Sequence, residues 1–92
     1  MPKLTIHFSE SAVMDLGTLK RWYSEQGVPD VGDRFITEIL GKVEVLHDRP
    51  DIGRIVPEFG QQSLREIIHP PFRVVYRREP KKVQVVCVWR SE

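Results

Sequence analysis

Three segments with the pattern of β-strands fill the last third of the chain, and the short turns between them restrict its fold more than any other feature. The segments are residues 63–69 (SLREIIH), 72–78 (FRVVYRR) and 83–90 (VQVVCVWR), and they are separated by Pro70–Pro71 and by the sequence EPKK. Proline-containing pairs of this kind mark turns. Because such short connections join neighbouring strands that run in opposite directions, we predict an antiparallel meander.

One further strand and two amphipathic helices are predicted upstream of the meander. Residues 3–8 (KLTIHF) alternate between apolar and polar side chains, as in a half-buried strand. Ser9 has the position of a helix N-cap, and the helix that it begins should end near Gly27. A second helix with a broad apolar stripe begins at Pro29 and ends before Pro50. Since only a few residues separate the two helices, they should form an antiparallel hairpin.

The predicted order of elements is β-α-α-β-β-β, in a single domain that spans residues 1–92. Residues 49–62 carry two prolines and two glycines and are predicted to form a loop. An antiparallel sheet packed on an α-helical hairpin is an α+β fold. Apolar residues make up 40% of the chain and charged residues 29%, which is typical of an ordered globular domain rather than a disordered one.

The composition also excludes several classes of protein. No apolar run approaches the roughly 18 residues that a membrane-spanning helix needs, and the N-terminus lacks the apolar core of a signal peptide. The simplest predicted location is therefore the cytoplasm. The single cysteine, Cys87, lies in a valine-rich segment and is predicted to be a small buried residue rather than a nucleophile. No second histidine or cysteine stands at metal-binding spacing from His7, and we expect no metal or organic cofactor.

Charge is distributed unevenly along a chain whose net charge is only +1. Residues 1–48 hold five Lys or Arg and eight Asp or Glu, a net charge of −3, whereas residues 49–92 hold nine and five, a net charge of +4. Such asymmetry indicates a polar partner for one face of the molecule. The alternative is that the charges only keep the surface of a small domain soluble.

Alternation along the predicted strands assigns each side chain to one face of the sheet. The face that meets the helices is predicted to hold the apolar side chains of Phe72, Val74, Tyr76, Val83, Val85, Cys87 and Trp89. The opposite face is predicted to hold the side chains of Arg73, Arg77 and Arg90. We therefore expect a sheet with one dry face and one solvated, cationic face.

We expect Arg65, Arg73 and Arg90 to converge on the solvated face, near Arg54. The guanidinium group makes planar, two-point contacts with phosphate and carboxylate groups, so such a cluster would bind a nucleic-acid backbone or an acidic peptide. The alternative is that neighbouring carboxylates, among them Glu58, form ion pairs with the arginines and use up part of this charge.

Several short motifs of this sequence, taken together, resemble the RelE/ParE superfamily of bacterial type II toxins. They are GRIVPE (Gly53–Glu58), LREI (Leu64–Ile67), FRVVYR (Phe72–Arg77) and the closing pattern V-x-V-V-x-V-W (Val83–Trp89). Upstream, the segment SAVMDLGTLKRWYSEQ resembles the first helix of the family. The resemblance covers nearly the whole chain. It implies the same β-α-α-β-β-β fold, and a growth-inhibiting toxin neutralised by the C-terminal segment of a cognate antitoxin that wraps around it.

The superfamily divides by mechanism: RelE-like members cleave mRNA on the ribosome, whereas ParE-like members inhibit DNA gyrase and are not nucleases. For a nuclease, the resemblance implies the candidate catalytic residues Arg54, Glu58, Arg65, Arg73, Tyr76 and Arg90. The arginines would bind phosphate, and Glu58 or Tyr76 would transfer protons. However, Arg90 stands where nuclease members often have a histidine, and arginine does not transfer protons near neutral pH. The sequence therefore favours the ParE-like branch, with a RelE-like mRNA endonuclease as the alternative.

Partner binding is predicted at a second set of residues, which comprises Trp22, Arg65, Arg73, Arg77 and Arg90. Trp22 lies off the apolar stripe of the first helix, as an interface anchor would, although it could instead pack against a loop. Some relatives continue into a C-terminal helix that this sequence lacks, so we expect an antitoxin segment to bind beside the last strand. The expected partners are thus an antitoxin together with gyrase or, in the alternative, the ribosome and mRNA. A third possibility is a protein of this fold that is barely toxic and acts as a regulator.

Overall fold

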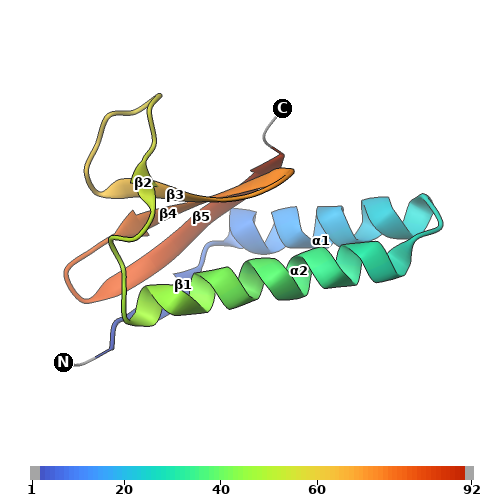
Figure 1. Ribbon diagram of the computed structural model, residues 1–92, viewed down its shortest axis with the longest axis horizontal. Helices are drawn as coiled ribbons and strands as arrows, with labels where there is room; N and C mark the ends of the chain where they lie inside the picture. The colour runs from blue at the N-terminus through green and yellow to red at the C-terminus, as the bar shows by residue number, and fades with distance from the viewer. Residues whose placement is uncertain (1–2, 91–92) are drawn as a thin grey trace.

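A computed structural model describes residues 3–90, so residues 1, 2, 91 and 92 of the predicted domain lie outside the described part. Its elements are β1 (Thr5–Phe8), α1 (Glu10–Glu25), α2 (Pro29–Glu44), a 3-10 turn η1 (Val45–His47), β2 (Arg54–Ile55), β3 (Leu64–His69), β4 (Phe72–Arg78) and β5 (Lys82–Arg90). The two helices lie side by side against one face of the sheet (Figure 1). The predicted order and the α+β fold are confirmed, and β2 is an additional two-residue strand inside the predicted loop.

The sheet has five strands in the order β1-β5-β4-β3-β2. The strands β3, β4 and β5 form the predicted antiparallel meander. The first strand, β1, departs from the predicted antiparallel arrangement, because it pairs with β5 in parallel up to the pair Phe8–Val85. This pairing is possible because no short turn joins β1 to β5: the helical hairpin and the rest of the meander lie between them along the chain.

The end of β1 is tied both to α1 and to β5 by Ser9. Its hydroxyl oxygen accepts a hydrogen bond from the Ala12 N–H (3.0 Å), which confirms the predicted N-cap, and it donates a hydrogen bond to the Val86 carbonyl (2.7 Å). Val86 is the extra residue of a β-bulge, since Val75 pairs with Cys87 while Tyr76, the next residue, pairs with Val85. Because Val86 has no partner residue on β4, the Ser9 hydroxyl supplies a hydrogen bond to its carbonyl.

Replacing Ser9 by Ala should therefore lower the free energy of unfolding by about 1–2 kcal/mol, because the helix loses its cap and the Val86 carbonyl loses its donor. Urea denaturation followed by circular dichroism measures this change. The matched control is Ser24→Ala, at an exposed site near the end of α1, which should change stability little. A loss for Ser9→Ala no larger than that of the control would show that the cap is not stabilising.

The bulge reverses the faces of the side chains in the last part of β5. Before it, Val83 and Val85 point toward the helices, as predicted. After it, Val88 packs among the residues beneath the helices and Cys87 packs on the outer face, which is the face of the sheet turned away from the helices. The faces predicted for Cys87, Trp89 and Arg90 are therefore wrong, because one extra residue shifts a period-two pattern by one position.

The main core lies between the helices and the sheet. Its buried members are Ala12, Leu19, Tyr23, Ile39, Val43, Leu46, Phe72, Val74, Tyr76, Val83, Val85 and Val88. The outer face is not simply solvated, because it carries a second buried cluster, which consists of Val56, Leu64, Val75 and Cys87. The predicted burial of Cys87 is confirmed, and that burial raises the pKa of its thiol to about 11, which leaves it protonated and unreactive at neutral pH.

Candidate functional site

The predicted convergence of Arg65, Arg73 and Arg90 is wrong, because the three side chains leave the sheet at different places. Arg65 pairs across the strands with Tyr76, and Arg90 pairs with Phe72. Since Tyr76 and Phe72 belong to the main core and cross-strand partners share a face, Arg65 and Arg90 lie on the helix side of the sheet. Their positions are roughly 13 Å apart along β4. Arg73 lies on the outer face.

On the outer face, a buried carboxylate binds two arginines. The side chain of Glu66 is fully buried and accepts hydrogen bonds from Nε of Arg54 (2.5 Å) and from Nε of Arg73 (2.7 Å). Arg73 also donates to the exposed carboxylate of Glu58 (2.9 Å). We refer to Arg54, Glu58, Glu66 and Arg73 as the Glu66 network. The structure thus confirms, for Arg54 and Arg73, the alternative in which carboxylates pair with the arginines and neutralise their charge. The buried partner of both is Glu66, which is not a neighbour of either along the chain.

On the helix side, Arg65 and Tyr76 anchor the loop between η1 and β3. Arg65 donates to the carbonyl oxygens of Gly53 (3.0 Å) and Gln62 (3.1 Å). The hydroxyl of Tyr76 donates to the carbonyl of Pro50 (2.7 Å) and accepts from the N–H of Gly53 (2.9 Å). Both side chains therefore have structural partners in the folded protein.

The geometry offers no group that is poised for proton transfer among the candidate catalytic residues. The hydrogen bond from Arg73 lowers the pKa of Glu58, which makes its carboxylate a weaker base. Burial raises the pKa of Tyr76, so its hydroxyl remains protonated and engaged. Arg90 is a cation without a transferable proton near neutral pH. Within residues 3–90, no three His, Cys, Asp or Glu side chains gather closely enough to hold a metal ion, and no helix is long and apolar enough to cross a membrane.

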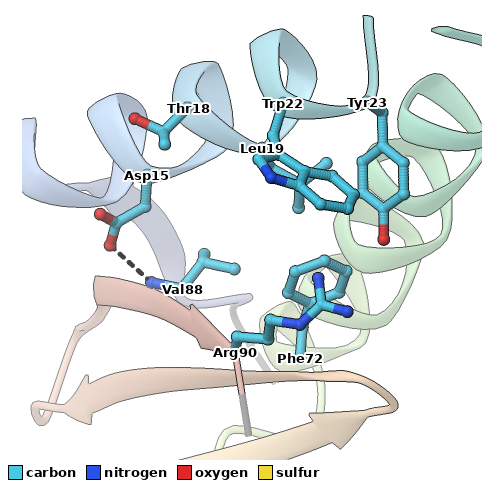
Figure 2. A pocket seen from close by; sticks show the side chains of 8 residues that line it. All are labelled: Asp15, Thr18, Leu19, Trp22, Tyr23, Phe72, Val88 and Arg90. Atoms are coloured by element: carbon cyan, nitrogen blue, oxygen red, sulfur yellow. Dashed lines mark hydrogen bonds between the residues drawn. The ribbon is translucent and has the colours of Figure 1, made fainter. Parts of the chain in front are cut away.

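A pocket between α1 and β5 brings together two of the predicted partner-binding residues, Trp22 and Arg90. We call it the α1–β5 pocket, and it is lined by Asp15, Thr18, Leu19, Trp22, Tyr23, Phe72, Val88 and Arg90 (Figure 2). Its volume is about 440 Å³. The Arg90 guanidinium lies 5.5 Å from the ring centre of Trp22 and 5.8 Å from that of Phe72, as in cation–π contacts.

Trp22 is 46% exposed, as its position off the apolar stripe predicts. It nevertheless packs edge-on against the buried ring of Tyr23, with 4.9 Å between ring centres. An exposed tryptophan at the mouth of a mostly apolar pocket fits the role of an interface anchor, which remains a prediction.

A second pocket lies on the outer side of β5, and we call it the outer pocket. It measures about 380 Å³ and is lined by Ser11, Asp15, Phe59, Leu64, Val75, Arg77, Val86, Cys87 and Trp89. Trp89 is 44% exposed, and its ring lies 5.9 Å from the Arg73 guanidinium. Strand alternation predicts Trp89 on the face that meets the helices, so its exposure on the outer face was not expected from the sequence. The unbroken apolar run from Val85 to Val88 is the signal that could have revealed the irregular strand.

The chain is similar to known proteins at the levels of sequence family and fold. A family model described as “ParE toxin of type II toxin-antitoxin system, parDE” matches residues 6–92. A chain in the solved structure of the chromosomal ParDE system from P. aeruginosa aligns with a TM-score of 0.81 and 20% identity, and the alignment covers 98% of this chain and 98% of that chain. A chain of the toxin–antitoxin complex RelBE2 from Mycobacterium tuberculosis aligns with a TM-score of 0.65 and 16% identity, covering 100% and 97% of the two chains. The search of curated proteins gave no match.

Proposed function

This chain belongs to the ParE toxins of type II toxin–antitoxin systems, and from that membership we propose that it inhibits growth by binding DNA gyrase and blocking its activity. In this proposal the protein acts as a binding module and performs no chemistry of its own. A gyrase target places it in the cytoplasm. Its candidate contact residues are the partner-binding set predicted from the sequence, of which Trp22 and Arg90 share one pocket.

The proposal rests mainly on one observation, which is that Arg73 is paired with two carboxylates of the same chain. Cleavage of RNA needs a base for the 2′-hydroxyl, an acid for the leaving oxygen and a cation for the phosphate. Arg73 is one of the arginines that would bind the phosphate in a nuclease, and here it is held by Glu66 and Glu58. Tyr76, a candidate for proton transfer, is buried beneath the helices. These contacts favour inhibition by binding over catalysis.

The alternative is a RelE-like, ribosome-dependent mRNA endonuclease. Glu58 is the one exposed carboxylate of the Glu66 network, and it would have to leave Arg73 to serve as a base. Arg54, Arg65, Arg73 and Arg90 would have to reorganise to reach one phosphate, since they now lie on both faces of the sheet. The alternative therefore requires a rearrangement that the proposed function does not need.

We also propose a cognate antitoxin as a binding partner. The family model is described by the two-component parDE systems, and two solved structures with a similar fold are described as a toxin–antitoxin system and a toxin–antitoxin complex. A tightly bound segment would have to bury surface that is exposed in the isolated chain. The exposed side chain of Trp22, beside a pocket of about 440 Å³, meets this requirement.

One pair of assays tests the proposed target. Purified protein is added to a gyrase supercoiling reaction and, in parallel, to a translating extract in which mRNA is mapped by primer extension. We expect loss of supercoiling while the mRNA stays intact, because the chain should bind gyrase and neither Glu58 nor Tyr76 is poised for proton transfer. Codon-positioned cuts with normal supercoiling would replace the proposed function by the nuclease alternative. Silence in both assays would leave a protein of this fold without toxicity.

A further inference from the structure

A third pocket lies at the edge of β3, beyond the end of β2. The two residues of β2 pair with Arg65 and Glu66, so from Ile67 onward β3 has no strand on this side within residues 3–90. The loop that leads from α2 to β2 runs past this edge (Figure 1). We call the hollow the β3-edge pocket, and its volume is about 410 Å³. It is lined by the aliphatic side chains of Val45, Ile52, Ile67 and Ile68 and by the cations Lys42 and Arg54.

Three of these aliphatic side chains are exposed, although each comes from a different part of the chain. Val45 belongs to η1, Ile52 to the loop before β2, and Ile68 to β3. Single exposed apolar side chains are common on protein surfaces, whereas apolar side chains that gather in a hollow with a polar rim mark sites of interaction. The β3-edge pocket is therefore a candidate contact surface.

The main chain on both sides of Ile52 is fixed, so this residue is held in place while it is exposed. Nη1 of Arg65 donates hydrogen bonds to the carbonyl oxygens of Asp51 (3.3 Å) and Gly53 (3.0 Å). The N–H of Ile52 donates to the carbonyl of Arg49 (3.2 Å), and Ile52 is 55% exposed. A partner that covers Ile52 would thus lose little free energy by ordering the loop, which favours binding.

Lys42 covers the open part of the β3 edge and brings positive charge to the pocket. Its amine donates a hydrogen bond to the carbonyl of Ile68 (3.1 Å), on the part of β3 that no strand covers within residues 3–90. No carboxylate of these residues forms an ion pair with this amine, and Glu38, one turn earlier on α2, binds His69 instead (3.0 Å). A lysine at a strand edge opposes the addition of a further strand. The pocket therefore fits a side chain of a folded partner better than an extended segment.

Arg54 adds a second cation on the outer side of the pocket. Its Nε donates to the buried carboxylate of Glu66 (2.5 Å), and its side chain is 62% exposed. Because the oxygens of Glu66 are hydrogen-bonded to Arg54 and Arg73 and are shielded from solvent, the pocket presents positive charge to a partner. It fits an apolar side chain that is flanked by a carboxylate. A second copy of this chain fits poorly, because a two-fold axis at the pocket would bring the cations of both copies together.

We propose that gyrase occupies the β3-edge pocket, inserting an apolar side chain while a neighbouring carboxylate pairs with Lys42 or Arg54. The inference rests on the proposed function, because it takes the partner to be gyrase. The antitoxin has another candidate surface, at Trp22 and the α1–β5 pocket. Strands β5 and β3 lie on opposite sides of β4, roughly 10 Å apart. The two partners are thereby assigned to separate surfaces.

The test is a supercoiling reaction with gyrase holoenzyme, in which the full-length chain is titrated to half-maximal inhibition. Ile52→Glu should raise the concentration needed at least about 30-fold, because it places a charge in the apolar hollow opposite a carboxylate. Lys42→Glu should raise it about 10-fold, because it reverses the charge at the rim. The controls are Val13→Glu on α1 and Lys81→Glu in the turn before β5, at exposed residues outside the pocket, and both should inhibit within about twofold of the unmodified protein.

Chemical labelling gives a readout on the unmodified chain. An acylating reagent modifies exposed lysine amines, and gyrase should slow the modification of Lys42 at least about fivefold, because the rim of a contact surface excludes solvent. Lys81 should be modified at the same rate with and without gyrase. Equal labelling of Lys42 in the presence and absence of gyrase, or full inhibition by both Ile52→Glu and Lys42→Glu, would overturn the proposal while the gyrase target stands.

Two further measurements keep folding and partner choice apart from this result. The urea denaturation midpoint shows whether Ile52→Glu is folded, and Ile52→Ser, expected to weaken inhibition about fivefold, replaces it if it is not. The product of the small open reading frame next to the toxin gene should bind the unmodified chain and both pocket variants within about twofold of one another. Weaker binding of that product by the variants, with inhibition of gyrase retained, would overturn the proposal and assign the pocket to the antitoxin. An unmodified chain that leaves supercoiling unchanged would overturn the proposed function and this inference together.

Discussion

Replacing Glu66 by Met should lower the free energy of unfolding by about 3 kcal/mol, because it leaves arginine charge without its buried acceptor. The Glu66 side chain is fully buried, whereas that of its partner Arg73 is 17% exposed. Methionine has a similar length, so the substitution removes the carboxylate without opening a large cavity. Exposed Arg54 can turn to water, but Arg73 lies beneath Trp89 and cannot be fully solvated. Urea denaturation at neutral pH measures the loss.

A double substitution identifies the cause. In Glu66→Met with Arg73→Met, no charge remains buried at the site, so stability should recover most of the loss seen for Glu66→Met alone. Glu58→Met removes the exposed partner of Arg73 and should have a small effect. A double variant less stable than Glu66→Met would contradict this cause, because it would show that Arg73 stabilises the fold even without its buried partner.

Strand alternation predicts the faces of side chains only as far as a strand stays regular. It placed Phe72, Val74 and Tyr76 correctly beneath the helices. It failed in β5 after Val86, because the bulge adds one residue on that strand only. The unbroken apolar run from Val85 to Val88 indicates an irregular strand, but it does not show which residue is the extra one, since both faces of the sheet carry apolar side chains at this point. The group that hydrogen-bonds to the bulge residue Val86 is the hydroxyl of Ser9, which is distant along the chain.

The same limit explains why the arginine cluster was predicted and is not observed. The sequence shows the charges but not their partners, because ion pairs across a sheet depend on strand register. Glu66 lies 12 residues from Arg54 and 7 from Arg73, and it binds both because β2 pairs with β3 and β3 pairs with β4. A two-residue strand inside a loop has no pattern that predicts it. The sequence did predict the order of the elements, the ends of the helices and the exposure of Trp22, because these depend on local patterns.

Replacing Gly53 by Ala should lower the free energy of unfolding by about 3 kcal/mol, since there is no space for a side chain at this position. An added Cβ would lie 2.6 Å from Oη of Tyr76, 2.7 Å from its Cε1 and 2.8 Å from the main-chain oxygen of Glu66. The Tyr76 ring is buried and cannot turn aside, and the Glu66 oxygen belongs to the sheet. The loop must therefore move away, which also breaks the Gly53 N–H bond to Tyr76. Urea denaturation gives the free energy.

Two controls separate this steric effect from a general effect of losing a glycine. Gly41→Ala, on the exposed side of α2, should raise the free energy of unfolding by up to about 1 kcal/mol, because apart from the adjacent backbone of the helix no atom lies within 4 Å of the new Cβ. Adding Tyr76→Phe to Gly53→Ala removes the closest contact, so the second substitution should cost less in that background than alone. Because Gly53 precedes Arg54 directly, a displaced loop should also weaken the Arg54–Glu66 pair. A Gly53→Ala protein as stable as the unmodified one would show that the loop is not tightly packed between Tyr76 and β3. It would also contradict the anchoring role assigned to Tyr76.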